Sequence, residues 1–359
     1  MKYDVTVFGA GPAGLAAAIK CAEAGLRVAV LEQSNFPRRC VGESVHPGVE
    51  AFFEELGISA DVAHARFLRY PGITVVGNGR REFCAFGKSN GRPWLGFHLW
   101  RPQFDDILLR RAREAGAFYL ENCGPTHVEV IADRVIVQSA RGPLQSSIVI
   151  DGTGRRRWLS RQWSLRAKAY SPPLVARYGY QQGFCPDYPD TPVFVWRNDG
   201  WDWMTRLRSD LYQWISLPFR KESMTSVLPP AEFRRLPEHG PNRAADVTWR
   251  LVHESAGKHH FLVGEACAVL DPSSSHGVLR ALTSGVLAAK CIREMLDRGF
   301  RGCERVSESY RRWQWQWFHN DVSRLRTIIS HEAPIGGLPN LDNRLRLRQL
   351  FVDCPPSVA

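Results

Sequence analysis

The chain opens with two short apolar runs separated by a helical pattern. Residues 3–8 and 27–31 are rich in β-branched and apolar residues, and residues 13–24 place small and apolar residues at helical spacing. Short apolar runs on either side of a helical segment are typical of buried parallel strands joined by a helix. The pattern therefore predicts a strand–helix–strand unit of an α/β domain.

Further along, the pattern changes several times. Residues 66–98 carry glycine, proline and short alternating runs, which indicate an excursion into small strands. Residues 101–117 read as an amphipathic helix, and residues 126–138 as a hairpin. From about residue 174 to 218 aromatic side chains alternate with polar ones, which is typical of an antiparallel sheet with one face over a cavity. A helix rich in tryptophan and arginine follows at residues 304–329.

These changes predict an α/β fold with a discontinuous Rossmann-like nucleotide-binding domain. An antiparallel-sheet substrate domain is inserted into it, and a helical segment ends the chain. We assign residues 1–70, 95–165 and 255–300 to the nucleotide-binding domain, 71–94 and 166–254 to the substrate domain, and 301–359 to the C-terminal helical region.

A glycine-rich turn joins the first strand to the first helix. Gly9, Gly11 and Gly14 permit a tight turn, close approach of a pyrophosphate and close helix–strand packing, respectively. The helix start at Pro12 and Ala13 then offers free N–H groups to a phosphate. Glu32 ends the second strand, where an acid bonds a ribose hydroxyl in dinucleotide-binding folds, and Gln33 follows it. The sequence therefore predicts a dinucleotide site.

Composition narrows the class of protein. The 359 residues carry a net charge of +11, which favours anionic partners, but the basic residues are spread out and no nucleic-acid-binding signature is present. No apolar run approaches the roughly 20 residues of a membrane span. Nine scattered cysteines without a CxxC pair indicate reduced thiols and no metal site. The first residues read as a strand and not as a signal peptide, so we expect a cytoplasmic protein without a nucleic-acid partner.

Three further segments distinguish FAD from NAD. Arg101 begins a helix, Asp151-Gly152 ends a strand, and Gly264-Glu265 follows another apolar run. With the glycine turn, these segments occur in the order found in the flavoprotein family that includes para-hydroxybenzoate hydroxylase, geranylgeranyl reductases and tryptophan-halogenase-like enzymes. Residues 1–300 resemble that family, which implies its type of FAD domain.

The resemblance implies a role for each segment. The glycine turn and Glu32 hold the ADP half of FAD, and Arg101 contacts the ribityl and phosphate part. Glu265 replaces the usual aspartate that bonds the ribityl chain, and the loop from Pro272 to Val278 faces the isoalloxazine ring. The candidate cofactor-binding residues are Gly9, Gly11, Pro12, Ala13, Gly14, Glu32, Gln33, Arg39, Gly42, Glu43, Ser44, Arg101, Asp151, Gly152, Gly264, Glu265, Pro272, Gly277 and Val278.

The resemblance also bears on the chemistry. The stretch Cys40–Gly48 is similar to the Gly-Glu-Ser loop of halogenase-like members, and Trp201 and Trp203 match part of their tryptophan motif. The lysine that halogenation requires after that loop is missing, because Tyr70 and Pro71 occupy its region. We therefore expect reduced FAD and O2 to hydroxylate an aromatic substrate, with NAD(P)H or an external reductase as electron source. The catalytic candidates are His276, Trp201 and Trp203.

Within this family, the altered halogenase motifs are similar to those of flavoproteins that mature tryptophylquinone cofactors. That likeness implies a monooxygenase that hydroxylates a tryptophan side chain in a precursor oxidase. The alternatives are a small-molecule aromatic hydroxylase, a non-oxygenating prenyl-type reductase, a flavin-dependent halogenase and a flavoprotein that only escorts a precursor. The aromatic face of residues 310–318 is either a core face or a wall of a substrate pocket.

Overall fold

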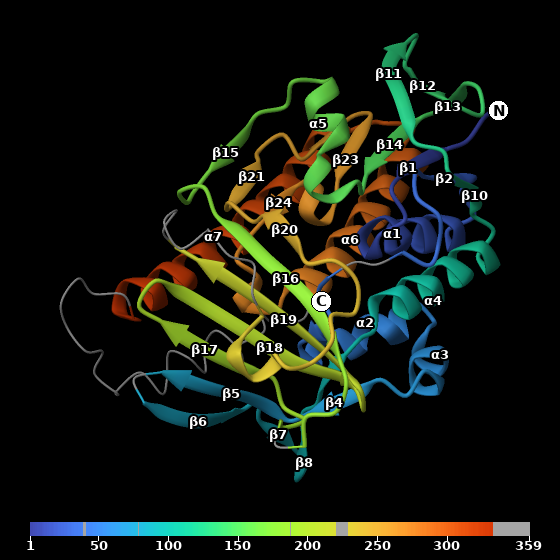
Figure 1. The fold of residues 1–359 in the computed structure, drawn as a ribbon. Helices are drawn as coiled ribbons and strands as arrows, with labels where there is room; N and C mark the ends of the chain where they lie inside the picture. The colour runs from blue at the N-terminus through green and yellow to red at the C-terminus, as the bar shows by residue number, and fades with distance from the viewer. Residues whose placement is uncertain (39–40, 78, 187, 220–228, 333–359) are drawn as a thin grey trace.

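The computed structural model describes residues 1–38, 41–77, 79–186, 188–219 and 229–332 of the chain. A parallel sheet with helices packed on it occupies one end of the molecule, and a larger sheet occupies the other (Figure 1). The arrangement confirms the predicted α/β fold class with a Rossmann-like domain and a second sheet. No helix among these residues is long and apolar enough to cross a membrane.

The parallel sheet is the core of the FAD-binding region. Its order is β10 (Phe118–Glu121), β2 (Val28–Glu32), β1 (Val5–Phe8), β14 (Ile148–Asp151), β23 (His260–Leu262) and β22 (Ala256–Gly257). Only β22 runs antiparallel to its neighbour. Every residue of β1, β2 and β14 is buried, because helices cover one face and a β-meander the other.

Three helices pack on the sheet beside one another. They are α1 (Pro12–Glu23), α4 (Arg101–Glu114) and α6 (Gly277–Asp297). The contact between α1 and α6 depends on small residues, since a Cβ at Gly285 would lie 2.3 Å from the carbonyl oxygen of Ala13. The meander β11 (Pro125–Ile131), β12 (Arg134–Ser139) and β13 (Leu144–Ser146) lies near α5 (Trp158–Gln162) (Figure 1).

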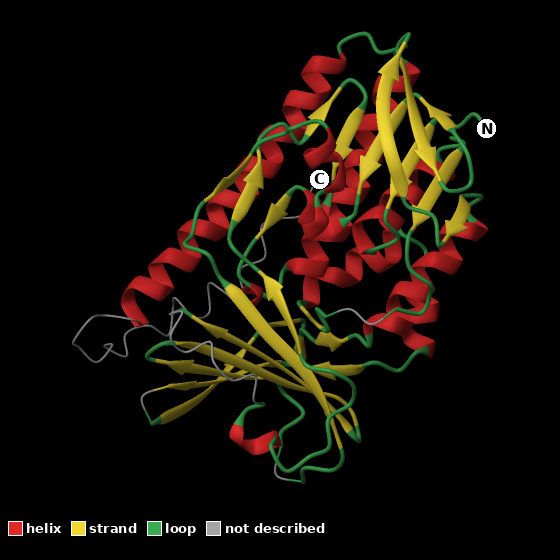
Figure 2. Ribbon diagram, turned by 45° about the horizontal axis from the view of Figure 1, so that its top comes forward, coloured by secondary structure: helices red, strands yellow, loops and turns green. Residues whose placement is uncertain are grey.

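The larger sheet has seven strands from two distant parts of the sequence, as the colours in Figure 1 show. Figure 2 shows it as the lower group of strands. Its order is β20 (Arg243–Asp246), β16 (Val175–Gln182), β19 (Leu211–Pro218), β18 (Gly200–Arg208), β17 (Val193–Arg197), β5 (Gly72–Gly77) and β6 (Arg80–Ala85). All neighbours are antiparallel except β17 and β5, which pair in parallel. Through this parallel pair, β5 and β6 from the early part of the chain join the strands formed by residues 175–246.

Short elements connect the two sheets. They are the three-stranded sheet of β3 (Ser44–Val45), β9 (Gly96–His98) and β4 (Leu68–Tyr70), the three-stranded sheet of β15 (Ala167–Ala169), β21 (Arg250–Val252) and β24 (Ala268–Val269), the pair β7 (Lys88–Ser89) and β8 (Arg92–Pro93), and the helices α2 (Glu50–Glu55) and α3 (Ser59–His64).

The C-terminal helix α7 (Cys303–Glu332) uses its aromatic face for packing. Tyr310 and Phe318 are almost fully buried, and Trp317 is 9% exposed. The hydroxyl of Tyr310 donates a hydrogen bond to the carbonyl oxygen of Leu262 at 2.9 Å, which ties the helix to β23. This aromatic face is therefore part of the core. Residues 333–359 of the predicted helical region lie outside the described residues.

Candidate functional site

A cavity of about 620 Å³ runs between the glycine turn, the start of α6 and the large sheet. Of the candidate residues, Gly9, Gly11, Pro12, Ala13, Glu32, Gln33, Gly42, Glu43, Ser44, Arg101, Gly152, Trp203, Gly264, Glu265, Pro272, Gly277 and Val278 line it. Four other candidates, Gly14, Asp151, Trp201 and His276, are not among its walls. Arg39 lies outside the described residues.

Gly9 and Gly14 let backbone segments of the glycine turn pack against one another more closely than any side chain would allow. A Cβ at Gly14 would lie 2.1 Å from the carbonyl oxygen of Gly9, and a Cβ at Gly9 would lie 2.6 Å from that of Gly152. Gly11 is the N-cap of α1 and no side chain caps the helix, so its first N–H groups are available to an anion. This cradle fits the pyrophosphate of FAD.

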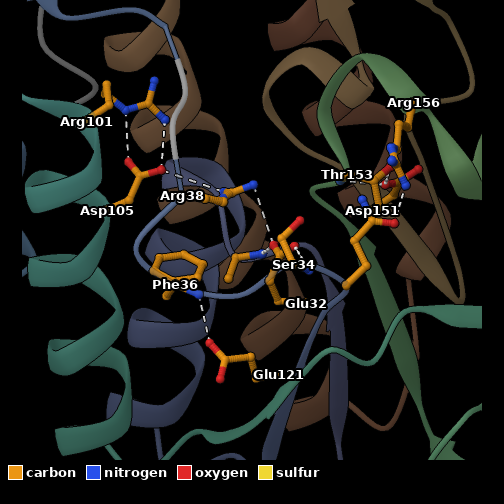
Figure 3. Close-up of polar contacts among 12 residues, drawn as sticks. Glu32, Ser34, Phe36, Arg38, Arg101, Asp105, Glu121, Asp151, Thr153 and Arg156 are labelled. Carbon is orange, nitrogen blue, oxygen red and sulfur yellow. Dashed lines mark hydrogen bonds and ion pairs between the residues drawn. The ribbon is translucent and has the colours of Figure 1, made fainter. Parts of the chain in front are cut away.

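A charged cluster flanks the turn (Figure 3). Glu32 accepts hydrogen bonds from the backbone N–H groups of Ala10 and Ser34 at 2.8 and 2.9 Å. The guanidinium of Arg38 lies between Glu32 and Asp105, 3.6 and 3.7 Å from their carboxylate oxygens. Its Nη2 would be 3.2 Å from a Cβ on Gly11, and its buried Nε has no hydrogen-bond partner. Arg38 is thus a phosphate-binding candidate that the sequence argument missed.

Arg101 is held rigidly at the opposite side of the cluster. Its Nε and Nη2 donate to the two carboxylate oxygens of Asp105 at 2.9 and 3.1 Å, and its Nη1 donates to the carbonyl oxygen of Val41 at 2.7 Å. A bidentate pair of this kind fixes both the position and the plane of the guanidinium. Arg101 therefore presents a preoriented positive charge to the cavity beside Gly42.

Asp151 shapes the turn that follows β14 without lining the cavity. One of its carboxylate oxygens accepts from the N–H and the hydroxyl of Thr153 at 2.9 and 2.6 Å, and the other accepts from the N–H of Leu159 at 2.9 Å. Burial raises the pKa of this carboxyl. The turn that it holds presents Gly152, Thr153 and two arginines to the cavity.

Glu265 lines the cavity, and its role as the acid that bonds the ribityl chain stays a prediction. Gly264 has the positive φ of +58°, and the side chain of Glu265 is half-exposed and 3.2 Å from Nε of Arg155. Arg156 likewise bonds the side chain of Gln33. Arg155 and Arg156, in the turn that follows β14, therefore pair with side chains that also line the cavity.

The loop before α6 forms a polar wall. Asp271 caps the turn by accepting from the N–H of Ser273 at 3.0 Å, and Ser275 adopts a positive φ. Burial raises the pKa of Asp271, whereas the nearby indole N–H groups of Trp201 and Trp249 act to lower it. Trp201 thus supports the loop from behind and does not face the cavity.

His276 is also buried behind this loop. Its Nδ1 lies 3.8 Å from Oδ2 of Asp321 on α7, and its ring packs edge-on against His46 with centroids 5.7 Å apart. The imidazole therefore points toward α7, while Ser275 and Gly277 on either side of it line the cavity. A catalytic role for His276 remains a prediction.

The Gly-Glu-Ser loop brings a buried acid to the cavity wall. Glu43 accepts from the N–H of Gly42 at 2.7 Å and from the hydroxyl of Tyr180. Burial raises its pKa to about 7, against the opposing effects of Tyr180 and Arg101. Ser44, next in the chain, accepts from the indole N–H of Trp203 at 3.2 Å. The loop thereby fixes Trp203 where the FAD cradle opens toward the large sheet.

The part of the cavity that lies over the large sheet is lined mostly by apolar side chains, and we call this part the chamber. The chamber is lined by Ala176, Tyr178, Gln213, Ile215, Ala245, Val247 and Leu270. These side chains come from β16, β19, β20 and the loops beside them. A small apolar chamber that opens onto a cofactor cradle is suited to a flat organic substrate.

Tyr70 is fully buried and does not line the cavity. Its ring stacks on His98 with centroids 4.2 Å apart, and its hydroxyl donates to the carbonyl oxygen of Val45 at 3.2 Å. Burial lowers the pKa of His98 to about 3, so this imidazole is neutral. Lys88 is exposed on β7, and no lysine of the described residues lines the cavity. The same residues hold no metal-binding group of three or more His, Cys, Asp or Glu side chains.

The parallel sheet, the glycine cradle and the preoriented arginines define the chain as an FAD-dependent oxidoreductase. A family model described as an FAD binding domain matches residues 4–40, which contain the first strand, the glycine turn and Glu32.

The chain is similar to halogenating flavoproteins. It is 26% identical over 324 residues to a 1H-pyrrole-2-carbonyl-[peptidyl-carrier protein] brominase of Pseudoalteromonas luteoviolacea, covering 82% of this chain and 78% of that protein. It is 27% identical over 323 residues to a tryptophan 2-halogenase of Chondromyces crocatus, covering 81% and 61%. The structure of flavin-dependent brominase Bmp2 superposes with a TM-score of 0.83 at 21% identity, covering 98% and 93%.

These comparisons contradict the prediction of aromatic hydroxylation, including hydroxylation of a tryptophan side chain in a precursor oxidase. Further relatives, 24 to 27% identical, are also named as halogenases or as a chlorinase. The prediction depended mainly on the missing lysine and the altered tryptophan motif, which are local features. The similarity to halogenases instead extends over about four fifths of the chain or more.

Proposed function

We propose that the protein is a flavin-dependent halogenase that acts on an electron-rich aromatic ring. In the overall reaction, reduced FAD in its anionic form, O2, a halide ion, two protons and the ring C–H give oxidised FAD, the C–halogen bond and two molecules of water. When bound and reduced, FAD supplies the two electrons that O2 requires for this reaction. The observation that carries the proposal is the single cavity that joins the FAD cradle to the apolar chamber, in a chain whose relatives halogenate.

Different residues would bind the phosphates, separate the flavin from the substrate and accept a proton. Arg38, Arg101 and the start of α1 neutralise the phosphates, while the loop at residues 271–278 and Trp203 separate the flavin end from the chamber. Glu43 is the buried acid at this junction. With a pKa of about 7 it is able to hold the proton that leaves the ring carbon.

The substrate is proposed to arrive on a partner protein. The pyrrole brominase and the related chlorinase are named for substrates carried on a peptidyl-carrier protein. A net charge of +11 on this chain favours an acidic carrier. This partner replaces the precursor oxidase expected from the sequence. We propose that NAD(P)H reaches the flavin through a separate reductase.

The test is a product assay under turnover. The protein is supplied with FAD, a flavin reductase, NADH, air and bromide or chloride, and with tryptophan, a phenol or carrier-bound pyrrole-2-carboxylate. The expected result is a brominated or chlorinated product by mass spectrometry, lost when halide or O2 is omitted. Release of all reducing equivalents as hydrogen peroxide with every acceptor would contradict the proposal. Glu43→Gln keeps the shape of the side chain. We expect this variant to lower the rate of product formation more than it lowers the rate of flavin reoxidation.

Tyr70 favours a second candidate function, a reductase that transfers electrons without O2. In the sequence, Tyr70 and Pro71 stand in the region where halogenase-like proteins carry the lysine, and no lysine of the described residues lines the cavity. The same protein preparation separates the two candidates. Substrate-dependent reoxidation of the reduced flavin in the absence of air favours the reductase, whereas the halogenase requires O2 for any product.

A further inference from the structure

A buried charge cluster links the C-terminal helix to the FAD cavity. Arg280, on the first turn of α6, lines the cavity, and its Nη2 lies 2.5 Å from Oδ2 of Asp321 on α7. The side chains of Arg280 and Asp321 are only 7% and 4% exposed. His276 approaches the same carboxylate oxygen at 3.8 Å. The cluster therefore places one positive and one negative charge behind the polar loop at residues 271–278.

The charges of Arg280 and Asp321 cancel, but not every polar atom of the cluster has a hydrogen-bond partner. The buried Nε of Arg280 has no hydrogen-bond partner, and the guanidinium packs against the Trp317 ring at 5.8 Å. Burial raises the pKa of Asp321, but the interactions with His276 and Arg280 outweigh it and lower this pKa to about 2. Asp321 is therefore ionised and cancels the charge of Arg280. A charge this deeply buried is poorly screened by water and salt.

We propose that Asp321 is a positioning residue that, through Arg280, sets how strongly the site prefers reduced over oxidised flavin. Reduction of the flavin ring takes up two electrons and one proton and leaves one negative charge on the ring. A positive charge on the cavity wall favours that anion, and Asp321 offsets it. The inference rests on FAD binding and not on halogenation, so it stands whichever substrate the enzyme uses.

Substitution of Asp321 and substitution of Arg280 should change the preference for reduced FAD in opposite directions. Asp321→Asn keeps the shape but leaves the Arg280 charge uncompensated, so the preference for reduced FAD should rise. Arg280→Gln leaves the Asp321 charge uncompensated, so the preference should fall. A unit charge roughly 10 Å away in an effective dielectric of about 20 changes the preference on the order of tenfold. For a two-electron couple, a tenfold change corresponds to about 30 mV in midpoint potential.

The experiment measures the midpoint potential of bound FAD by equilibration with a reference dye, in the full-length protein. Asp321→Asn is expected to raise it by about 30 mV and Arg280→Gln to lower it by a similar amount. The double variant, which is neutral again, should return close to the wild-type value. Glu294→Gln is the matched control. Glu294 also forms an ion pair on α6, with Arg298, but it lies about four turns further along the helix than Arg280.

Loss of the carboxylate leaves a buried unpaired arginine, so Asp321→Asn is the variant most at risk of unfolding. Circular dichroism melting of each variant identifies that case, and Arg280→Gln with the double variant then provides the test. Opposite shifts that cancel in the double variant support the proposal. Shifts of the same sign in both single variants, or shifts no larger than that of Glu294→Gln, overturn it.

Discussion

The buried carboxyl of Glu43 makes the stability of this protein depend on pH in a defined direction. Its pKa is about 7 in the folded protein against an ordinary value of 4.5. The folded state therefore binds the proton more tightly than the unfolded state. The favourable contribution is complete below pH 4.5 and is lost as the pH rises through 7, because folding then buries a carboxylate.

Replacing Glu43 by glutamine removes this dependence. From the two pKa values, the wild type should lose roughly 2.5 kcal/mol of unfolding free energy at this residue between pH 5 and pH 8. Glutamine keeps the volume but gives up an acceptor to Gly42 or Tyr180, which costs about 1–3 kcal/mol at every pH. The absolute stability of the variant is thus less informative than its change with pH.

The assay is urea unfolding of wild type and Glu43→Gln at pH 5 and pH 8. The difference in unfolding free energy should move in favour of the variant by roughly 2.5 kcal/mol as the pH rises. Tyr180→Phe is the control, and it should act in the opposite direction. The Tyr180 hydroxyl favours the carboxylate form of Glu43, so without it the unfolding free energy should fall more between pH 5 and pH 8 than in the wild type. A difference between wild type and Glu43→Gln that is the same at both pH values would refute the reasoning.

Three further predictions follow from single contacts. Gly14→Ala should weaken FAD binding at least tenfold by fluorescence titration, because the new Cβ lies 2.1 Å from the Gly9 carbonyl oxygen; unchanged affinity would mean that the turn does not hold the cofactor. Trp203→Phe loses the hydrogen bond to Ser44 and should raise the KM for the aromatic acceptor several-fold without changing the Kd of FAD, and an effect on FAD alone would contradict this placement. Tyr70→Phe should lower the unfolding free energy by about 1–2 kcal/mol in urea, because the hydroxyl loses its bond to the Val45 carbonyl oxygen and its interaction with Ser44, and a loss of several kcal/mol would argue for a larger network.

The FAD-binding fold was predictable because its signals are local. The backbone of the turn between the buried strand and the helix requires glycines at positions close together in the sequence. Glu32 follows at the end of the next strand. The parallel pairing of β5 with β17 was not predictable, because it joins residues far apart in the sequence. Periodicity gives the face of a strand but not its neighbour.

The packing of the side chains explains why Trp201, a predicted catalytic residue, does not line the cavity. Trp201 and Trp203 share a face of β18, yet only Trp203 lines the cavity, while Trp201 supports Asp271 from behind. Arg38 and Asp321 carried no recognisable motif, since each acquires its role from a partner brought close by folding. The missing lysine was a real local signal, but it was given more weight than the rest of the chain supported.

The most direct measurement is a crystal structure of the protein with FAD bound. We predict the adenosine ribose at Glu32, the pyrophosphate at the start of α1 beside Arg38, and the isoalloxazine ring against the loop at residues 271–278, facing the chamber behind Trp203. Electron density for FAD outside this cavity, or with its ring directed away from the chamber, would contradict the account.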